Sequence, residues 1–244
     1  MQFLQVLPFL KMRNLLFFST LLAVISVVGC KPTENNSYYR ITGTIENSSE
    51  GDTVMLQTED DQNLVELERA FIHNGQFVFT GRQDSTVERI ITYIKNGVKM
   101  GAVFFLENGN IKMKLDETTS ITGTKHNDIY QEFLNKINGI YGQMSSVNEN
   151  LADSADIDTT HTDIYQKVNS LDKKANDLII ETIKENINNP IGLYLFKRYN
   201  YLLPPKLQYF LISKMPLSWR RTTAIDDIKT QLDLLPQDSI SSLE

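Results

Sequence analysis

ITGTKHNDIY, residues 121–130, is the stretch at which the hydrophobic pattern of the chain changes its period. Before it, apolar residues alternate with polar ones, which is typical of strands with one buried face. After it, apolar residues recur at helical spacing, and Asn127 or Asp128 is placed to cap the start of a helix. The stretch therefore predicts an α+β fold with an antiparallel β domain over residues 38–125 and a helical segment over residues 126–244.

The β domain is predicted from alternating apolar positions and from tight turns. The one-faced strands carry Tyr39/Ile41, Val54/Leu56, Phe77/Phe79 and Ile111/Met113/Leu115. Asn74-Gly75, Asn96-Gly97 and Asn108-Gly109 lie between such runs, and Asn-Gly favours the type I′ turn because both residues tolerate positive φ. We expect three hairpins, with residues 89–94 and 102–106 as the most buried strands. A β-sandwich and a partly open barrel both fit this pattern.

The helical segment is predicted to be a helical hairpin followed by a compact helical cap. The first helix has one apolar stripe, formed by Ile129, Phe133, Leu134, Ile137, Tyr141, Met144 and Leu151. A polar interval, residues 152–162, separates it from a second amphipathic helix. That helix should end before Asn189-Pro190, because the residue before a proline disfavours helical backbone. Prolines then divide the remainder into helices at about residues 191–202, 206–215 and 218–235.

The N-terminus has the parts of a secretory signal. Arg13 supplies a basic start, residues 15–28 an apolar run and Gly29 a small residue before a cleavage site. The run is short for a membrane span, which needs about 20 apolar residues. Its ending, Val27-Val28-Gly29-Cys30, resembles signals of the bacterial lipoprotein class. The resemblance implies a diacylglycerol on the Cys30 thiol, cleavage between Gly29 and Cys30, and acylation of the freed amine.

We therefore expect a signal peptide over residues 1–29 and a flexible tether over residues 30–37. Met12 is the expected true start, because residues 1–11 fit poorly as a basic leader. Several acyl chains anchor a protein stably where one chain is marginal, so the protein should be attached to the envelope, at the outer membrane, without spanning it. An ordinary signal peptide, or a short N-terminal helix with Cys30 as an incidental thiol, is the alternative.

Composition and charge exclude some classes of partner. The chain is 41% hydrophobic and 22% charged, which is ordinary for a globular protein. After removal of the signal, with Lys11 and Arg13, it retains 22 basic against 30 acidic residues. This balance argues against nucleic acid, which requires a concentrated basic surface. The single cysteine leaves no thiol for a disulfide once it carries lipid.

Four short segments carry a resemblance that covers residues 38–235. They are YRITGTI at 39–45, NGQFVFTG at 74–81, FLENGNI at 105–111 and ITGT at 121–124. Their order resembles the domain of unknown function that precedes a thioredoxin-like module in many lipoproteins of Gram-negative anaerobes. That module carries Trp-Cys-x-x-Cys, whose first cysteine performs thiol–disulfide exchange. The present chain has no Cys-x-x-Cys and ends where the module would begin, so the resemblance implies a fold and a location without an activity.

No catalytic or metal-binding motif is found in the sequence. His73, His126 and His161 have no second histidine or glutamate at zinc-site spacing. An acidic cluster near His161 lacks the glycine and glutamate of a calcium loop; it consists of Asp153, Asp156, Asp158 and Asp163. Nucleophile-elbow, P-loop and dinucleotide fingerprints are also missing. We expect neither an enzyme nor a cofactor or metal, although a carboxylate pair from separate strands stays open.

Aromatic and basic residues are concentrated in residues 194–221. They are Tyr194, Phe196, Tyr199, Tyr201, Tyr209, Phe210 and Trp219, interleaved with Lys197, Arg198, Lys206, Arg220 and Arg221. Tyr, Trp and Arg are common interface anchors, so the segment could be a docking surface around Tyr199 and Trp219. We favour the alternative in which the aromatic side chains form the helical core and the basic ones its solvated rim.

Five Asp-Ser/Thr triplets resemble acceptors of the O-glycosylation system of some Gram-negative anaerobes. They begin at Asp52, Asp84, Asp153, Asp158 and Asp238. Such pairs are also common in turns because of their own hydrogen bonds. Glycosylation is therefore a hypothesis that rests on short motifs.

The sequence as a whole predicts a non-catalytic envelope lipoprotein with a binding or accessory role. Its partners would be the membrane, through the lipid on Cys30, and an envelope protein, while its ligand is unknown. The alternative is an accessory partner, or a truncated relative, of a thioredoxin-like thiol–disulfide oxidoreductase.

Overall fold

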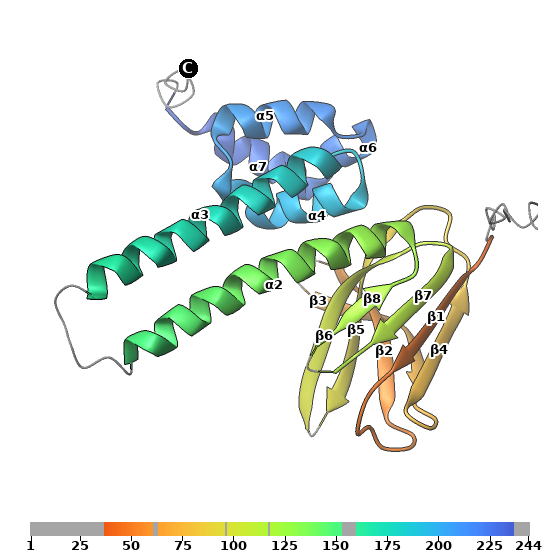
Figure 1. Ribbon diagram of the computed structural model, residues 1–244. Coiled ribbons are helices and arrows are strands. Elements are labelled where there is room, and N and C mark those ends of the chain that lie inside the picture. Colours follow the sequence, from red (N-terminus) through yellow and green to blue (C-terminus); the bar gives the residue numbers. More distant parts are fainter. Residues whose placement is uncertain (1–36, 61–62, 96, 117, 153–159, 237–244) are drawn as a thin grey trace, which may run out of the picture. The chain divides into compact units, whose positions relative to one another are not determined.

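The computed structural model describes residues 37–60, 63–95, 97–116, 118–152 and 160–236. Within these residues eight strands form two four-stranded sheets, and the helices follow them in the chain (Figure 1). The first sheet has the order β4-β1-β7-β8, with bounds Gln76–Gly81, Tyr39–Thr44, Gly109–Lys114 and Ser120–Thr122. The second has the order β3-β2-β5-β6, with bounds Asn63–Phe71, Thr53–Asp60, Val87–Lys95 and Val98–Leu106. The expected α+β fold is confirmed.

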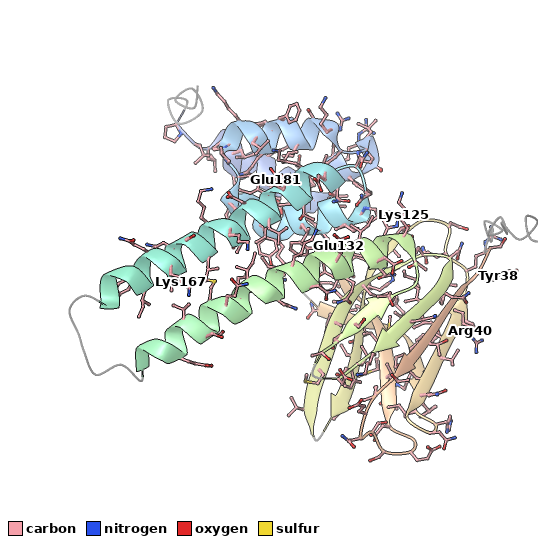
Figure 2. All side chains as sticks on the ribbon, in the orientation of Figure 1. Tyr38, Arg40, Lys125, Glu132, Lys167 and Glu181 are labelled. Atoms are coloured by element: carbon pink, nitrogen blue, oxygen red, sulfur yellow. The ribbon has the colours of Figure 1, made fainter. Side chains whose placement is uncertain are left out.

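The two sheets share one hydrophobic core, so the β domain is a sandwich. Strand alternation turns every second side chain inward, as in β1, where Ile41 lies opposite both Phe79 and Ile111. The outward residues of β1 are exposed or half-buried, and Arg40 points away from the sandwich (Figure 2). Gly43 faces Phe77 across the strands, and a Cβ on Gly43 would lie 2.0 Å from the Phe77 ring. The ring therefore fills the space that a side chain at position 43 would need.

Two of the three expected Asn-Gly hairpins were predicted wrongly. β5 and β6 do form an antiparallel hairpin around Gly97. Asn74 and Gly75 make a tight turn with positive φ, but it connects β3 and β4, which lie in different sheets. Asn108-Gly109 likewise connects β6 to β7 in the other sheet. Turn chemistry fixes the shape of a turn, whereas sheet membership depends on which strands bury their apolar faces together.

One strand pairing corrects the expectation of a purely antiparallel β domain. β1 and β7 run parallel, with Tyr39 opposite Gly109 and Thr44 opposite Lys114. β7 enters the first sheet from β6 in the second sheet, so its direction is set by this crossover and not by a hairpin. The first sheet is therefore mixed.

The helices form the expected hairpin and cap, with one further break. α2 and α3 are the long helices, and α4, a 3₁₀ turn, α5, α6 and α7 follow; their bounds are Lys125–Ala152, Thr160–Asn186, Pro190–Tyr199, Asn200–Leu202, Pro205–Lys214, Leu217–Arg220 and Thr223–Asp233. Asn189 caps α4 by accepting the Ile191 N–H at 3.0 Å. The helix expected over residues 218–235 is split, because Thr222 has extended backbone between α6 and α7.

The start of α2 differs from the sequence-based expectation. Neither Asn127 nor Asp128 is the residue before the helix, which begins at Lys125. The first-turn N–H of His126 donates to Oε1 of Glu107 at 2.8 Å, so a carboxylate from the β6–β7 turn caps the helix. Asp128 accepts the Gly123 N–H at 2.7 Å. A cap supplied by a residue 19 positions away leaves no local sequence signal.

Phe105 joins the β domain to the helical core. Its neighbours Phe104 and Leu106 belong to the sandwich core, whereas Phe105 belongs to the helical core with Tyr130 and Phe133. Residues 104–106 are buried, because both faces of β6 are covered there, whereas residues 102 and 103 of the same predicted strand are half-buried. The other strand expected to be most buried, residues 89–94, has only its middle buried, and Ile94 is exposed. The Phe105 ring lies edge-on to the Tyr130 ring at 5.3 Å between centroids.

Several sequence-based predictions concern residues outside the described ranges. These are the signal peptide, Cys30 and most of the tether, together with residues 153–159 of the polar interval. The ends of that interval were predicted wrongly, because residue 152 belongs to α2 and residues 160–162 belong to α3. No helix within the described ranges has the length and apolarity needed to cross a membrane.

Candidate functional site

Alternation along β5 turns Glu88 and Ile90 away from the sandwich core, toward the helices. Ile91 and Tyr93 face the core, and Glu88 lies opposite Phe105, which packs on the helical core. α4 lies over this part of the sheet and contributes Tyr194. Sheet and helix thus leave a space between them whose walls come from distant parts of the chain.

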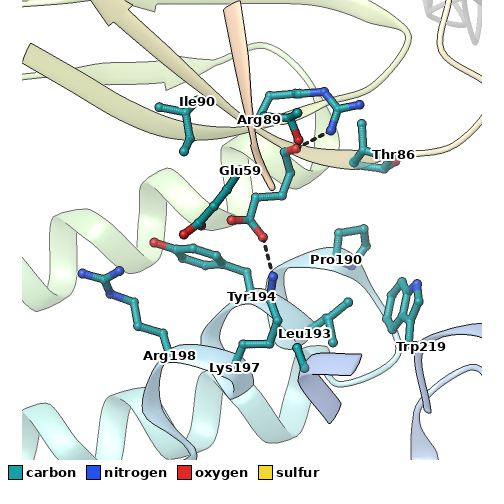
Figure 3. Close-up of a pocket in the computed structure, with 14 residues that line it drawn as sticks. Glu59, Thr86, Arg89, Ile90, Pro190, Leu193, Tyr194, Lys197, Arg198 and Trp219 are labelled. Atoms are coloured by element: carbon teal, nitrogen blue, oxygen red, sulfur yellow. Dashed lines mark hydrogen bonds and ion pairs between the residues drawn. The ribbon is translucent and has the colours of Figure 1, made fainter. Parts of the chain in front are cut away.

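A cleft of about 600 Å³ occupies this space (Figure 3). Its lining comes from β2, from β5 and the residue before it, and from the helical cap: Thr58, Glu59, Thr86, Val87, Glu88, Arg89, Ile90, Pro190, Leu193, Tyr194, Lys197, Arg198, Trp219 and Ala224. Cavities of 300–1,000 Å³ with apolar walls and a few polar groups are the usual form of small-molecule sites. We define these residues as the β5–α4 cleft.

One ion pair crosses the cleft from sheet to helix. Lys197 Nζ on α4 lies 3.0 Å from Glu88 Oε2 on β5, and both side chains are partly exposed (Figure 3). The pair links residues 109 positions apart in the sequence. The pair bridges β5 and α4 and places opposite charges side by side in the wall of the β5–α4 cleft.

Tyr194 carries the aromatic side of the cleft. Its ring lies edge-on to Phe105 and Tyr130, at 6.2 and 5.6 Å between centroids. Burial raises the pKa of the Tyr194 hydroxyl, and burial also raises that of Tyr130. Both hydroxyls are therefore neutral at physiological pH. The neighbouring Tyr194 and Tyr199 hydroxyls act to raise the pKa of Arg198, which stays a cation at the cleft.

Arg89, whose side chain lies on the sandwich side of β5 with Ile91 and Tyr93, has one buried polar atom without a partner in the described part of the chain. Its Nη1 donates to the Glu88 carbonyl at 2.7 Å, but its buried Nε has no hydrogen-bond partner among the described residues. Burial lowers the pKa of the Arg89 guanidinium. Buried donors without partners are rare in folded proteins.

The aromatic and basic segment divides between core and surface. Phe196 is fully buried, and four more aromatic residues pack partly buried against the helical core: Tyr194, Tyr199, Tyr209 and Trp219. The favoured interpretation as a core is confirmed for these five residues. Tyr201 and Phe210 are exposed, at 72% and 55% of their surface. Trp219, Lys197 and Arg198 line the cleft, so part of the rim belongs to a concave site.

The described histidines each contact a carboxylate. His73 Nδ1 lies 2.6 Å from Glu50 at an exposed turn, and His126 Nδ1 lies 2.6 Å from Glu107 at the start of α2. His161 lies in α3, with a side chain outside the described set. Among the described residues, no group of three or more His, Cys, Asp or Glu side chains is arranged to hold a metal ion.

A second hollow lies between α2 and α3. It measures about 720 Å³, and its lining includes exposed charged side chains, among them Glu132 and Glu181, which Figure 2 labels. Glu132 pairs with Lys136 one helical turn away at 2.7 Å. Exposed pairs of this kind contribute little to stability or recognition, so we do not assign a site there.

Glu59, Glu88 and Arg89 are cleft residues that the sequence did not indicate. Alternation along β5 does place Glu88 on the outer face, which is a weak local signal. Its partner Lys197 is on α4, however, and no local pattern predicts which helix covers this face.

Comparison with known proteins gives a match to one family model, over the β domain. Residues 39–130 match the family described as "Domain of unknown function (DUF4369)". The match covers all eight strands and the start of α2. No curated protein and no solved structure gives a significant match to the chain.

Proposed function

We propose that this protein is a non-catalytic lipoprotein of the cell envelope that binds a ligand or partner in the β5–α4 cleft. Two features support the proposal: the Val27-Val28-Gly29-Cys30 ending and the cleft itself. Lipid on Cys30 would hold the protein at the outer membrane, and the cleft would face the aqueous compartment. The proposed binding role rests on the presence of this cleft.

The chemistry of the cleft favours binding over catalysis. Glu88 and Lys197 neutralise each other, and Tyr194 is held in its neutral form by burial. A general acid or base would instead need a proton that it can exchange near neutral pH. The walls of the cleft combine apolar surface from Leu193 and Trp219 with oriented hydrogen-bonding groups. This combination is typical of a surface that binds a ligand.

Lipid attachment is tested by metabolic labelling with a fatty-acid analogue in a Gram-negative host. The wild type should be labelled and recovered with membranes, and Cys30→Ala should lose both properties. Trp219→Ala is the control, because it alters the cleft and leaves Cys30 intact. Equal labelling of the wild type and of Cys30→Ala would refute the lipid anchor.

Binding is tested by photo-cross-linking in the native envelope. A photoreactive amino acid replaces Leu193 inside the cleft or, as a control, Phe210 on the exposed face of α5. A distinct adduct should form from position 193 and be absent from position 210. Identical adducts from both positions, or none from position 193, would contradict a cleft-binding role.

The same experiment distinguishes the alternative function. The resemblance to domains that precede thioredoxin-like modules motivates an accessory role in thiol–disulfide exchange. A thioredoxin-like envelope protein in the adduct from position 193 would favour that role. Disulfide reductase activity of the purified Cys30→Ser protein would instead contradict the non-catalytic proposal, because this variant has no cysteine.

A further inference from the structure

β3 is one of the two edge strands of the second sheet, with β2 beside it. It is nine residues long, and eight of them are exposed. Its large apolar side chains are among the exposed ones: Leu64 at 42%, Val65 at 43%, Leu67 at 50% and Phe71 at 57%. A long, exposed and apolar edge strand is a template for pairing with a strand of another chain.

The pairing of β3 with β2 shows which face each β3 residue occupies. Ala70 and Glu68 lie opposite Val54 and Leu56, whose side chains are in the sandwich core, so they share the inner face. Arg69 and Phe71 therefore share the outer face. Leu67 is an extra residue in a bulge opposite the Leu56–Gln57 step.

The bulge shifts the alternation for the first half of β3. Glu66 lies opposite Gln57, on the outer face, and Leu64 lies on the same face opposite Glu59. Val65 is consequently on the inner face. In an antiparallel pair, residues directly opposite each other must share a face. This requirement limits how two copies of β3 can align.

One alignment places residues of the same face opposite each other on both sides of the bulge. The same alignment also pairs opposite charges with each other and apolar side chains with each other. It places Leu64 opposite Phe71, Val65 opposite Ala70, and Glu66 opposite Arg69, with the two bulges meeting at a two-fold axis. Every pair then occurs twice, because the interface is symmetric. Opposite charges and aromatic–aliphatic pairs directly across strands are both stabilising.

We propose that β3 is a self-association surface, on which β3 of a second copy of this chain docks antiparallel in this alignment. The two second sheets would become one continuous sheet. In each chain Arg69 Nη2 already lies 2.7 Å from Glu66 Oε2, so the dimer brings two such pairs together as an alternating cluster of four charges. These charges restrict pairing to a strand with opposite charges at the matching positions, which this strand itself provides.

The charge pattern is tested by co-capture of two differently tagged copies of the full chain in a Cys30→Ser background. Arg69→Glu places like charges opposite each other twice, so capture should weaken about tenfold. The double variant Glu66→Arg with Arg69→Glu should restore it. Arg82→Glu, which reverses an exposed, ion-paired arginine away from β3, should leave capture unchanged. Circular dichroism melting verifies that each variant is folded.

The alignment is tested by cysteine cross-linking between co-expressed single variants. Opposite residues in an antiparallel pair have Cα atoms about 4.5–5.5 Å apart, which a disulfide can bridge. Glu66→Cys with Arg69→Cys should therefore cross-link, and Glu66→Cys with itself should not. Failure of two copies to co-capture, an unaffected Arg69→Glu variant, or equal cross-linking of both combinations would overturn the proposal, as would capture of another protein on β3 in place of a second copy.

Discussion

The side-chain amide of Asn127 is paired with the backbone of Phe105. Asn127 Oδ1 accepts the Phe105 N–H at 2.9 Å, and its Nδ2 donates to the Phe105 carbonyl at 2.7 Å. β6 is an edge strand, so these backbone groups have no neighbouring strand in the sheet. The asparagine supplies the two hydrogen bonds that such a strand would make, and it thereby attaches the first turn of α2 to the β domain.

Replacing Asn127 should destabilise the protein more than any exposed substitution on α2. Asn127 is 1% exposed and also donates to Thr124 Oγ1 at 2.8 Å. Asn127→Ala leaves the Phe105 N–H and carbonyl buried without partners, which should cost about 2–4 kcal/mol in the free energy of unfolding. Urea denaturation measures this value. Asn135→Ala, on the same helix but exposed, should change it by less than about 0.5 kcal/mol.

The lowered pKa of Glu107 predicts that the folded protein loses stability in acid. Burial acts to raise its pKa, but hydrogen bonds from the His126 ring, the His126 N–H and Thr124 outweigh it and lower the pKa below the usual 4.5. The folded state therefore favours the carboxylate. Its contribution is complete above the unfolded pKa and is lost as the pH falls through the lower folded value.

The test compares the pH dependence of unfolding free energy for the wild type and Glu107→Gln. Between about pH 5 and pH 3, the wild type should lose stability more steeply, because only it loses this carboxylate. Glu185→Gln, which neutralises an exposed glutamate of α3, should keep the wild-type slope. Equal slopes for wild type and Glu107→Gln would contradict the role of Glu107 as the cap of α2.

The sequence predicted those parts of the fold that depend on neighbouring residues. The switch of period near His126 located the change from strands to helices, and Asn189-Pro190 located the end of α3. Alternation also identified the buried residues of β1 and β7. In these cases the residues that determine the structure lie within a few positions of one another.

The failures involve contacts between distant segments. The Asn74-Gly75 turn has the predicted local shape, yet it crosses between sheets. Asn127 has the residue type of a helix cap, but it bonds to Phe105 because the edge of β6 lies beside the first turn of α2. The cleft was missed for the same reason, since the Glu88–Lys197 pair exists only after α4 has packed on β5.

Two glycines should respond in opposite directions to the same substitution. A Cβ on Gly43 would overlap the buried Phe77 ring, so Gly43→Ala should destabilise the protein by about 1–3 kcal/mol. Gly139 lies in α2 with open space around its Cα, so Gly139→Ala should stabilise by up to about 1 kcal/mol through helix propensity. Urea denaturation of both variants checks the prediction. Equal effects would show that Phe77 does not occupy the space beside Gly43.

The Glu88–Lys197 pair should control the width of the cleft while contributing little to global stability. Both side chains are partly exposed, so a double-mutant cycle with Glu88→Gln and Lys197→Met should give a coupling of about 0.5–1 kcal/mol. Phe105 and Tyr194 still hold α4 against the sheet, and the variants should remain folded.

Trp219 is the single tryptophan of the chain and lines the same cleft, so its fluorescence reports the local change. Lys197→Glu, which faces Glu88 with a like charge, should open the cleft and shift Trp219 emission to longer wavelength, while Lys173→Glu on the exposed face of α3 should leave it unchanged. An unshifted spectrum for Lys197→Glu would show that the pair does not hold the two walls together.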